Sequence, residues 1–313
     1  MWGKRLEDIR PGTVMAYAIL LTLLGYLKVF FHPLPSYDWT FLGEEYEMFS
    51  GIRWILPILW SIIALLVNFF VTEQFTLLKR HSYLGFLWGI VLITVGDFRF
   101  AIYSLMSLLW FLSVLRIQKS SRPIADFLDT GLLVGLYTLL DLRFALLLVA
   151  SWVIMLTFAR LRWRAIFGSI WGTVTIHLLF VIAYFTLGNV DVYWAYIQQW
   201  PELAVQIPAN TDVVWIGVLL FFWLLGLGNY ITALSQANIM KRQSLSAILI
   251  LQLALIGLAV SGLWPNSIYL AFLPLGTLIF IGNDLQYRKK YWWRDTVFWI
   301  FILALALSFF ERT

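Results

Sequence analysis

The sequence predicts an all-α integral membrane protein, folded as a polytopic bundle of about eleven transmembrane helices. Hydrophobic residues make up 61% of the 313-residue chain and charged residues only 12%, which is far more apolar than a soluble domain requires. Apolar runs follow one another along the chain, each close to the ~20 residues with which a helix crosses the hydrocarbon core. Basic residues gather in clusters that alternate with gaps almost free of them, as expected of loops on two sides of a membrane.

The apolar runs, taken in chain order, predict the spans themselves. They cover residues 14–31, 53–71, 82–96, 101–116, 124–140, 144–159, 165–187, 214–233, 245–263, 267–283 and 295–309. Runs such as "WILPILWSIIALLVNFFV" are apolar on all sides, whereas an outer-membrane strand would alternate with a period of two. We therefore expect one integral membrane domain over residues 1–313, with two longer outer loops at 32–52 and 188–213.

The basic clusters predict the orientation of the spans. Seventeen of the 22 Lys and Arg residues lie in six clusters, which are Lys4, Arg5 and Arg10; Lys79 and Arg80; Arg116, Lys119 and Arg122; Arg160, Arg162 and Arg164; Lys241 and Arg242; and Arg288, Lys289, Lys290 and Arg294. A cytoplasmic N-terminus puts all six clusters inside and the C-terminus outside, in agreement with the positive-inside rule. The net charge of +5 then reflects flanks that face anionic lipid, so the expected partner is the lipid bilayer and not nucleic acid.

The two outer loops differ from the other connections in composition. The first loop, 32–52, carries four acids, which are Asp38, Glu44, Glu45 and Glu47. In the second loop, 188–213, apolar and aromatic residues recur at helical spacing before Pro201, namely Val190, Tyr193, Trp194, Ile197 and Trp200. This pattern predicts an amphipathic helix that lies in the outer interface.

The fourth and sixth spans each belong to one copy of an internal repeat. The segment "GDFRFAIYSLMSLLWFLSVLRI" around residue 97 matches "LDLRFALLLVASWVIMLTFARL" around residue 141, with the motif Asp-x-Arg-Phe-Ala at a separation of 44 residues. Each copy is expected to form a short helical hairpin, over 82–116 and 124–159, with the motif in its outer turn. Helices of about 15 to 17 residues span only ~22 to 26 Å, so either these outer turns are recessed in the membrane or the bilayer is thinned above them.

The charged residues of the motif allow two interpretations. Asp97 and Asp141 each stand where a turn becomes a helix, the position of an N-cap carboxylate. Arg99 and Arg143 stand on the outer side, where basic residues are few. Each arginine either forms a local ion pair with the capping aspartate or contributes to a site for phosphate or carboxylate. In the second interpretation the four residues form the floor of an outward-facing cavity beneath the two outer loops.

Few polar residues lie inside the spans. His177 and Gln252 are near the middle of theirs, and each either makes one hydrogen bond between helices or serves a proton or substrate path. No metal site is expected, because His32, His81 and His177 are assigned to the outside, the inside and the middle of the membrane, and cysteine is absent. The chain also lacks a Gly-rich phosphate loop and a nucleophile elbow. An enzyme of this sequence would therefore work with carboxylates, and no cofactor can be assigned.

Acids in an outer loop just after the first span resemble multi-spanning glycosyltransferases that depend on polyprenyl phosphate. The resemblance implies that Asp38, or one of Glu44, Glu45 and Glu47, activates the acceptor hydroxyl of a reaction with a polyprenyl-phosphate-linked sugar. It also implies that Arg99 and Arg143 neutralise the phosphate leaving group. The alternative is a solvated acidic loop on the outer face.

A second resemblance covers roughly residues 110 to 175. The segments "LRIQKSSRPIADFLDTGLLVGLYTLLDLRFALLLV" and "RWRAIFGSIWGTVT" resemble a family of uncharacterised polytopic inner-membrane proteins from Bacteroidota. This resemblance implies a multi-pass protein of the cell inner (cytoplasmic) membrane with a role in the envelope. Two functions stay open: a lipid-linked sugar or glycan transferase acting at the outer face, and a non-enzymatic envelope-assembly partner or transporter subunit that docks envelope proteins on its outer loops.

Overall fold

The computed structural model describes residues 11–31, 38–41, 44–47, 51–74, 77–78, 83–95, 98–120, 122–158, 162–198, 210–261, 266–287 and 291–307. The elements in chain order are α2 (Pro11–Phe31), β1 (Asp38–Phe41), β2 (Glu44–Glu47), α3 (Ile52–Phe69), the π-helical turn η1 (Phe70–Gln74), α4 (Tyr83–Val95), α5 (Phe98–Lys119), α6 (Pro123–Thr138), the 3-10 turn η2 (Leu142–Ala145), α7 (Leu146–Thr157), α8 (Trp163–Thr186), α9 (Val190–Gln198), α10 (Asn210–Gln236), α11 (Ile239–Ser261), α12 (Asn266–Tyr287) and α13 (Tyr291–Leu307).

The helices confirm a multi-pass membrane protein of α-helical architecture. Each predicted span corresponds to one helix in the described part of the chain. Six helices are long and apolar enough to cross a membrane, over Gly12–Phe31, Ile52–Thr72, Phe98–Gln118, Trp163–Thr186, Leu219–Gln236 and Ile239–Ile256. Two shorter apolar helices cover Leu84–Val95 and Leu142–Thr157. The count of eleven crossings and the orientation stay predictions.

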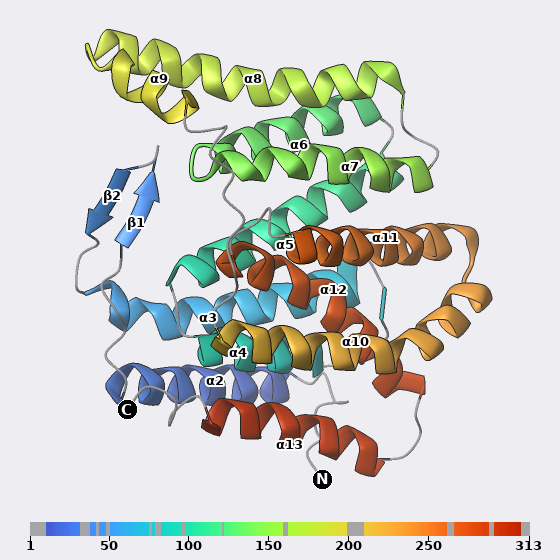
Figure 1. Cartoon of the computed structure of the whole chain (residues 1–313). Helices are drawn as coiled ribbons and strands as arrows, with labels where there is room; N and C mark the ends of the chain where they lie inside the picture. The colour runs from blue at the N-terminus through green and yellow to red at the C-terminus, as the bar shows by residue number, and fades with distance from the viewer. Residues whose placement is uncertain are drawn as a thin grey trace.

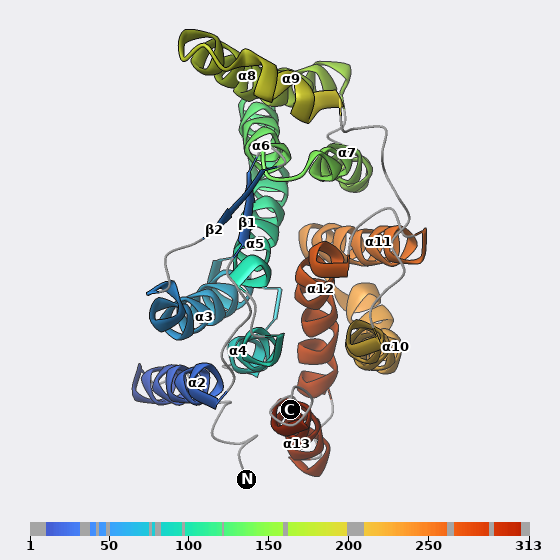
Figure 2. The ribbon, with the colours of Figure 1, turned by 60° about the vertical axis from the view of Figure 1, so that its left-hand side comes forward.

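The helices lie side by side in an elongated row (Figure 1). Helices α8 and α9 form one end of the row, and α2 and α13 lie at the other end in both views (Figures 1 and 2). Helices α5 and α12 contact each other near the middle and cross the remaining helices obliquely. The main buried core follows this row, whereas α8 packs chiefly on α6 and leaves most of its surface exposed.

Polar side chains connect neighbouring helices inside this core. The Trp110 indole on α5 donates to Ser151 Oγ on α7 at 2.9 Å. The Tyr137 hydroxyl on α6 donates to the Met106 carbonyl on α5 at 3.0 Å. Hydrogen bonds of this kind stabilise helix pairs in a medium without water, where an unpaired polar group is costly. They fix α5, α6 and α7 against one another next to the repeated motif.

The repeated helices differ from the predicted short hairpins in two respects. Helix α5 has 22 residues, so the predicted length of about 16 residues is wrong. Its added last turn is stabilised through Gln118, whose amide donates to the Met240 carbonyl and whose Oε1 accepts from Ser244 on α11. Helices α4, α6 and α7 are short, with 13, 16 and 12 residues. Within each repeat the two helices contact each other little, because α4 packs mainly on α3 and α6 mainly on α8.

The loop over residues 32–52, which is predicted to lie outside, contains a β-hairpin that the sequence patterns did not predict. Strands β1 and β2 pair antiparallel, with Asp38 opposite Glu47 and Thr40 opposite Glu45. Because residues alternate between the two faces of a strand, this register assigns three of the four acids, Asp38, Glu45 and Glu47, to one face. The hairpin lies at the same end of the helices as the α8–α9 turn (Figure 1).

Candidate functional site

The site is built on the close pair of helices α6 and α8. Gly131 and Gly135 on α6 and Gly168 and Gly172 on α8 form two Gly-x-x-x-Gly motifs. A Cβ atom on Gly131 would lie 2.0 Å from the Ser169 carbonyl oxygen, closer than any side chain permits. The glycines therefore let the two backbones touch, and the Thr173 hydroxyl donates across the contact to the Gly131 carbonyl at 2.9 Å.

This contact brings His177 on α8 against Thr138 at the end of α6. His177 Nε2 lies 2.8 Å from Thr138 Oγ1, and the Thr138 hydroxyl donates to the Gly135 carbonyl at 2.7 Å. Since threonine has one hydroxyl proton, Nε2 of a neutral imidazole is the donor to Oγ1, and Nδ1 is left as an acceptor. His177 thus makes the hydrogen bond between helices that was one of its two expected roles.

Helix α9 folds back against α8 and completes the contact with His177. The turn between them depends on Gly188, whose φ of 75° lies in the left-handed region that glycine adopts without strain. The Tyr193 hydroxyl lies 2.5 Å from His177 Nδ1 and so donates to it. Tyr193 and Tyr196 are buried. Trp194, which the sequence pattern assigned to the same apolar face as Tyr193, is instead exposed, and Tyr196, which lay outside that pattern, is buried. Trp200 and Pro201 lie outside the described residues.

Tyr196 extends the polar contacts from α9 toward the repeated motif. Its hydroxyl donates to the Thr138 carbonyl. Burial, and then the negative charge of the neighbouring Asp141, raise the pKa of Tyr196 well above its ordinary value. Burial also raises the pKa of Tyr193 to about 12, so both phenols stay protonated at neutral pH. Thr138 therefore connects His177 with the corner that holds Asp141.

A pocket of about 340 Å³ lies beside these contacts, and we call it the α8–α9 crevice. Its lining comes from α6, the η2–α7 corner, α8 and α9, and consists of Thr138, Leu142, Ala145, Thr173, Val174, His177, Leu178, Val181, Tyr193, Trp194 and Ile197. Most of these side chains are apolar, and the polar groups gather around His177. The volume is within the range of small-molecule sites. Such a crevice suits the apolar chain of an amphiphile better than a soluble polar ligand.

The second copy of the motif forms the corner next to the crevice. Asp141 is the N-cap of η2 and accepts from the Arg143 backbone N–H at 2.8 Å. Arg143 Nε lies 3.9 Å from Asp141 Oδ1, so capping and a local ion pair are both present in this copy. Burial raises the pKa of Asp141, while the backbone hydrogen bond and the charge of Arg143 oppose this shift.

The first copy of the motif lies near the second. Arg99 is half-buried in the first turn of α5. One turn later the Tyr103 ring packs against Phe144 of the second copy, with centroids 5.4 Å apart. The two motif helices therefore meet at the same corner. Asp97 lies outside the described residues.

The remaining predicted site residues belong to the hairpin. Asp38, Glu44, Glu45 and Glu47 have described backbones in β1 and β2, and their side chains lie outside the described part of the structure. Within the described residues, no group of three His, Asp or Glu residues could hold a metal ion. The structure thus links His177 through Thr138 to the corner of Asp141 and Arg143, which the α5 helix of Arg99 also contacts.

The sequence patterns missed Thr138 and Tyr196 as parts of the site. Both are separated from their partners by many residues: Thr138 meets His177 at a sequence distance of 39 and Tyr196 meets Thr138 at 58. The paired Gly-x-x-x-Gly motifs were the available signal, since they predict that α6 and α8 touch. With that contact known, Thr138 and His177 become candidates, since they follow Gly135 and Gly172 by three and five residues.

Comparison with known proteins gives one match. A family model described as a family of unknown function (DUF6427) matches residues 42–313. The matched region contains β2, both copies of the motif and the whole α8–α9 crevice. No curated protein and no solved structure matches the chain.

Proposed function

The chain belongs to the DUF6427 family, whose function is unknown, and from this premise we propose an inner-membrane transferase of lipid-linked sugar or glycan that acts at the outer face. The α8–α9 crevice carries the proposal, because it joins an apolar space to a polar corner. Val174, Leu178 and Trp194 in its wall are exposed, so a lipid chain can enter from the side of the membrane. Each methylene buried there contributes about 0.8 kcal/mol.

The polar corner is suited to the phosphate of such a lipid. Arg143 lies next to the crevice residue Leu142, and Arg99 lies on the helix that packs against Phe144. Guanidinium groups form charge-assisted hydrogen bonds with phosphate oxygens. A phosphate at this corner would compete for Arg143 with Asp141 Oδ1, which lies 3.9 Å from Arg143 Nε.

The hairpin acids supply the base of the proposed reaction. One of Asp38, Glu44, Glu45 and Glu47 takes the proton of an acceptor hydroxyl, whose oxygen attacks the anomeric carbon of the sugar. The bond from that carbon to the phosphate oxygen breaks, and its electron pair leaves on the phosphate. Arg99 and Arg143 stabilise the charge that develops there. The shared face of Asp38, Glu45 and Glu47 favours these three over Glu44.

Substitution of the proposed groups tests the transferase. We expect Asp38→Asn, Glu45→Gln and Arg99→Gln each to lose cellular function in a strain that depends on the protein, at a normal protein level in the membrane. Asp129→Asn removes an exposed carboxylate near the start of α6 and is the matched control. If all three variants keep full function, the transferase proposal fails.

A non-enzymatic docking role in envelope assembly is the second candidate. It is favoured by the hairpin, because in the described residues β1 and β2 pair with each other alone and each strand has a free edge. Two strands alone are marginally stable in water, and an extended segment of a partner would add a third. Function that survives the loss of every hairpin acid but not deletion of the hairpin would support docking.

A further inference from the structure

The ends of four helices converge at the opposite end of the bundle from the hairpin. Ala165 in the first turn of α8 packs with Phe127 of α6, Ile117 of α5 and Met155 of α7 in a small buried cluster. A Cβ atom on Gly168 would lie 3.6 Å from the Ile124 carbonyl oxygen, so α6 and α8 begin side by side. The start of both helices and the end of α5 therefore form one surface.

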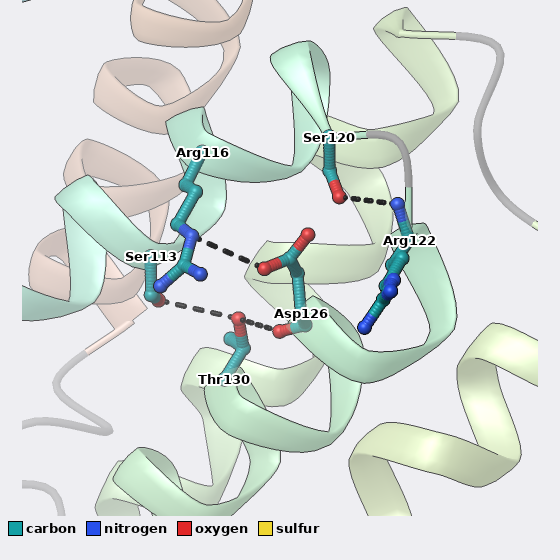
Figure 3. Close-up of polar contacts among 6 residues, drawn as sticks. All are labelled: Ser113, Arg116, Ser120, Arg122, Asp126 and Thr130. Atoms are coloured by element: carbon teal, nitrogen blue, oxygen red, sulfur yellow. Dashed lines mark hydrogen bonds and ion pairs between the residues drawn. The ribbon is translucent and has the colours of Figure 1, made fainter.

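Four arginines lie on this surface. Arg116 Nε contacts Asp126 Oδ1 at 3.2 Å, and the side chain of Asp126 is 7% exposed while that of Arg116 is 70% exposed. Figure 3 shows the Asp126 carboxylate between Arg116 and Arg122. Arg122, Arg162 and Arg164 are exposed, and the acids of α6 at this end are Asp126 and Asp129. Arginines therefore outnumber acids, and the surface is positive.

The backbone presents both helix starts and helix ends at this surface. Arg122 and Arg162 are the N-cap residues of α6 and α8, and neither side chain makes a capping hydrogen bond. The Arg122 backbone N–H donates to Ser120 Oγ at 2.8 Å, which holds the entry to α6 in place. Helices α6 and α8 direct the positive ends of their dipoles at the arginine surface, whereas α5 and α7 end there with their negative ends, so the arginines supply the net positive charge.

An exposed apolar surface begins at the same place. Trp163 stands between Arg162 and Arg164, and Phe167 and Trp171 follow it on α8 as exposed aromatic residues. Tryptophan favours the boundary between headgroups and acyl chains. The charged surface thus adjoins an exposed apolar face of α8. A site for a soluble anion would not require such an apolar face.

We propose that Arg122, Arg162 and Arg164 bind the phosphate of an anionic phospholipid whose acyl chains lie along the exposed face of α8. Basic residues between helix ends are suited to such headgroups because each cation near a membrane surface adds attraction to anionic lipid. Arg116 forms the ion pair with Asp126, and this pair connects the end of α5 with the start of α6. This site is separate from the α8–α9 crevice, which lies toward the other end of α8.

Native mass spectrometry of the purified full chain tests the site. Phosphatidylglycerol and phosphatidylcholine are offered at equal concentration, and we expect phosphatidylglycerol to be retained preferentially. The triple variant Arg122→Gln, Arg162→Gln and Arg164→Gln should lose this preference, with affinity falling roughly fivefold for each charge removed. Lysine at the same three positions should keep most of it. Arg53→Gln, an exposed arginine at the start of α3, is the control and should bind as the original chain does.

Three results would overturn the proposal. The first is equal retention of the two lipids by the original chain. The second is unchanged preference for phosphatidylglycerol in the triple glutamine variant. The third is displacement of phosphatidylglycerol by inorganic phosphate at equal concentration, which would indicate a site for a free anion. If the triple variant does not fold, Arg164→Gln alone makes the same comparison, because this arginine is exposed and lies outside the N-cap positions.

Discussion

His177 Nδ1 lies 2.5 Å from the Tyr193 hydroxyl, and this contact fastens α9 to α8 over the crevice. The other ring nitrogen reaches Thr138 on α6. One side chain on α8 therefore connects this helix with α9, which follows after a turn, and with α6, from which it is separated in the chain by η2 and α7. Its partners determine whether the crevice keeps its shape.

Tyr193→Phe should loosen α9. The substitution keeps the ring and leaves His177 Nδ1 without its donor, at a cost of about 1 kcal/mol. We expect a lower unfolding midpoint in detergent and faster proteolysis in the α8–α9 region. Tyr26→Phe removes a hydroxyl that donates to the Trp54 carbonyl in an exposed contact, and it should change little. Equal behaviour of the two variants would show that the His177 contact does not hold α9.

Gly131→Ala should separate α6 from α8. The added methyl group meets the Ser169 carbonyl oxygen, which belongs to a backbone that cannot rotate away. Overpacking of this kind costs about 1 to 3 kcal/mol. Gly228→Ala is the control, since a Cβ atom there meets nothing within 4 Å. We expect the thermal unfolding midpoint in detergent to fall for Gly131→Ala and to stay unchanged for Gly228→Ala, and equal midpoints would contradict the close contact.

Asp141→Asn should change the pH dependence of stability. Burial raises the pKa of Asp141 in the folded protein above its ordinary 3.8, so the folded state binds more protons than the unfolded state just above that pH. The original chain therefore loses stability as pH rises from about 3.8 through the folded pKa. Asparagine keeps an N-cap oxygen and does not titrate. Unfolding midpoints measured across this range should favour the asparagine variant increasingly as pH rises, and a constant difference would contradict the assignment.

The apolar helices were predictable because their cause is local. A run such as that of α3 is apolar on all sides, and hydrocarbon leaves a helix as the only way to pair its backbone. The hairpin was missed because its alternation is short: Asp38 and Thr40 share one face, and Trp39 and Phe41 share the other. The last turn of α5 was missed because Gln118 is polar, and its partners lie more than a hundred residues away.

The site was less predictable than the fold because its contacts depend on distant neighbours. Asp141 and Arg143 are two residues apart, and their contact follows from capping rules. The contact of His177 with Thr138 depends on the glycine contact between α6 and α8. Asp284 is another residue whose contact could not be predicted. It is buried and accepts a hydrogen bond from the Trp293 indole at 2.9 Å, whereas the sequence indicated only the basic cluster that follows it.

Occupancy of the α8–α9 crevice by a polyprenyl phosphate is the most direct test of the account. A photoreactive polyprenyl phosphate is bound to the purified chain, irradiated and mapped by peptide mass spectrometry. Val174→Phe narrows the crevice from a position that is 37% exposed, and Val153→Phe on α7 is a matched control at 38%. We expect labelling of α8 and α9, which Val174→Phe abolishes and Val153→Phe leaves intact. Labelling that Val174→Phe leaves unchanged, or that falls on other helices, would contradict binding of the lipid in the α8–α9 crevice.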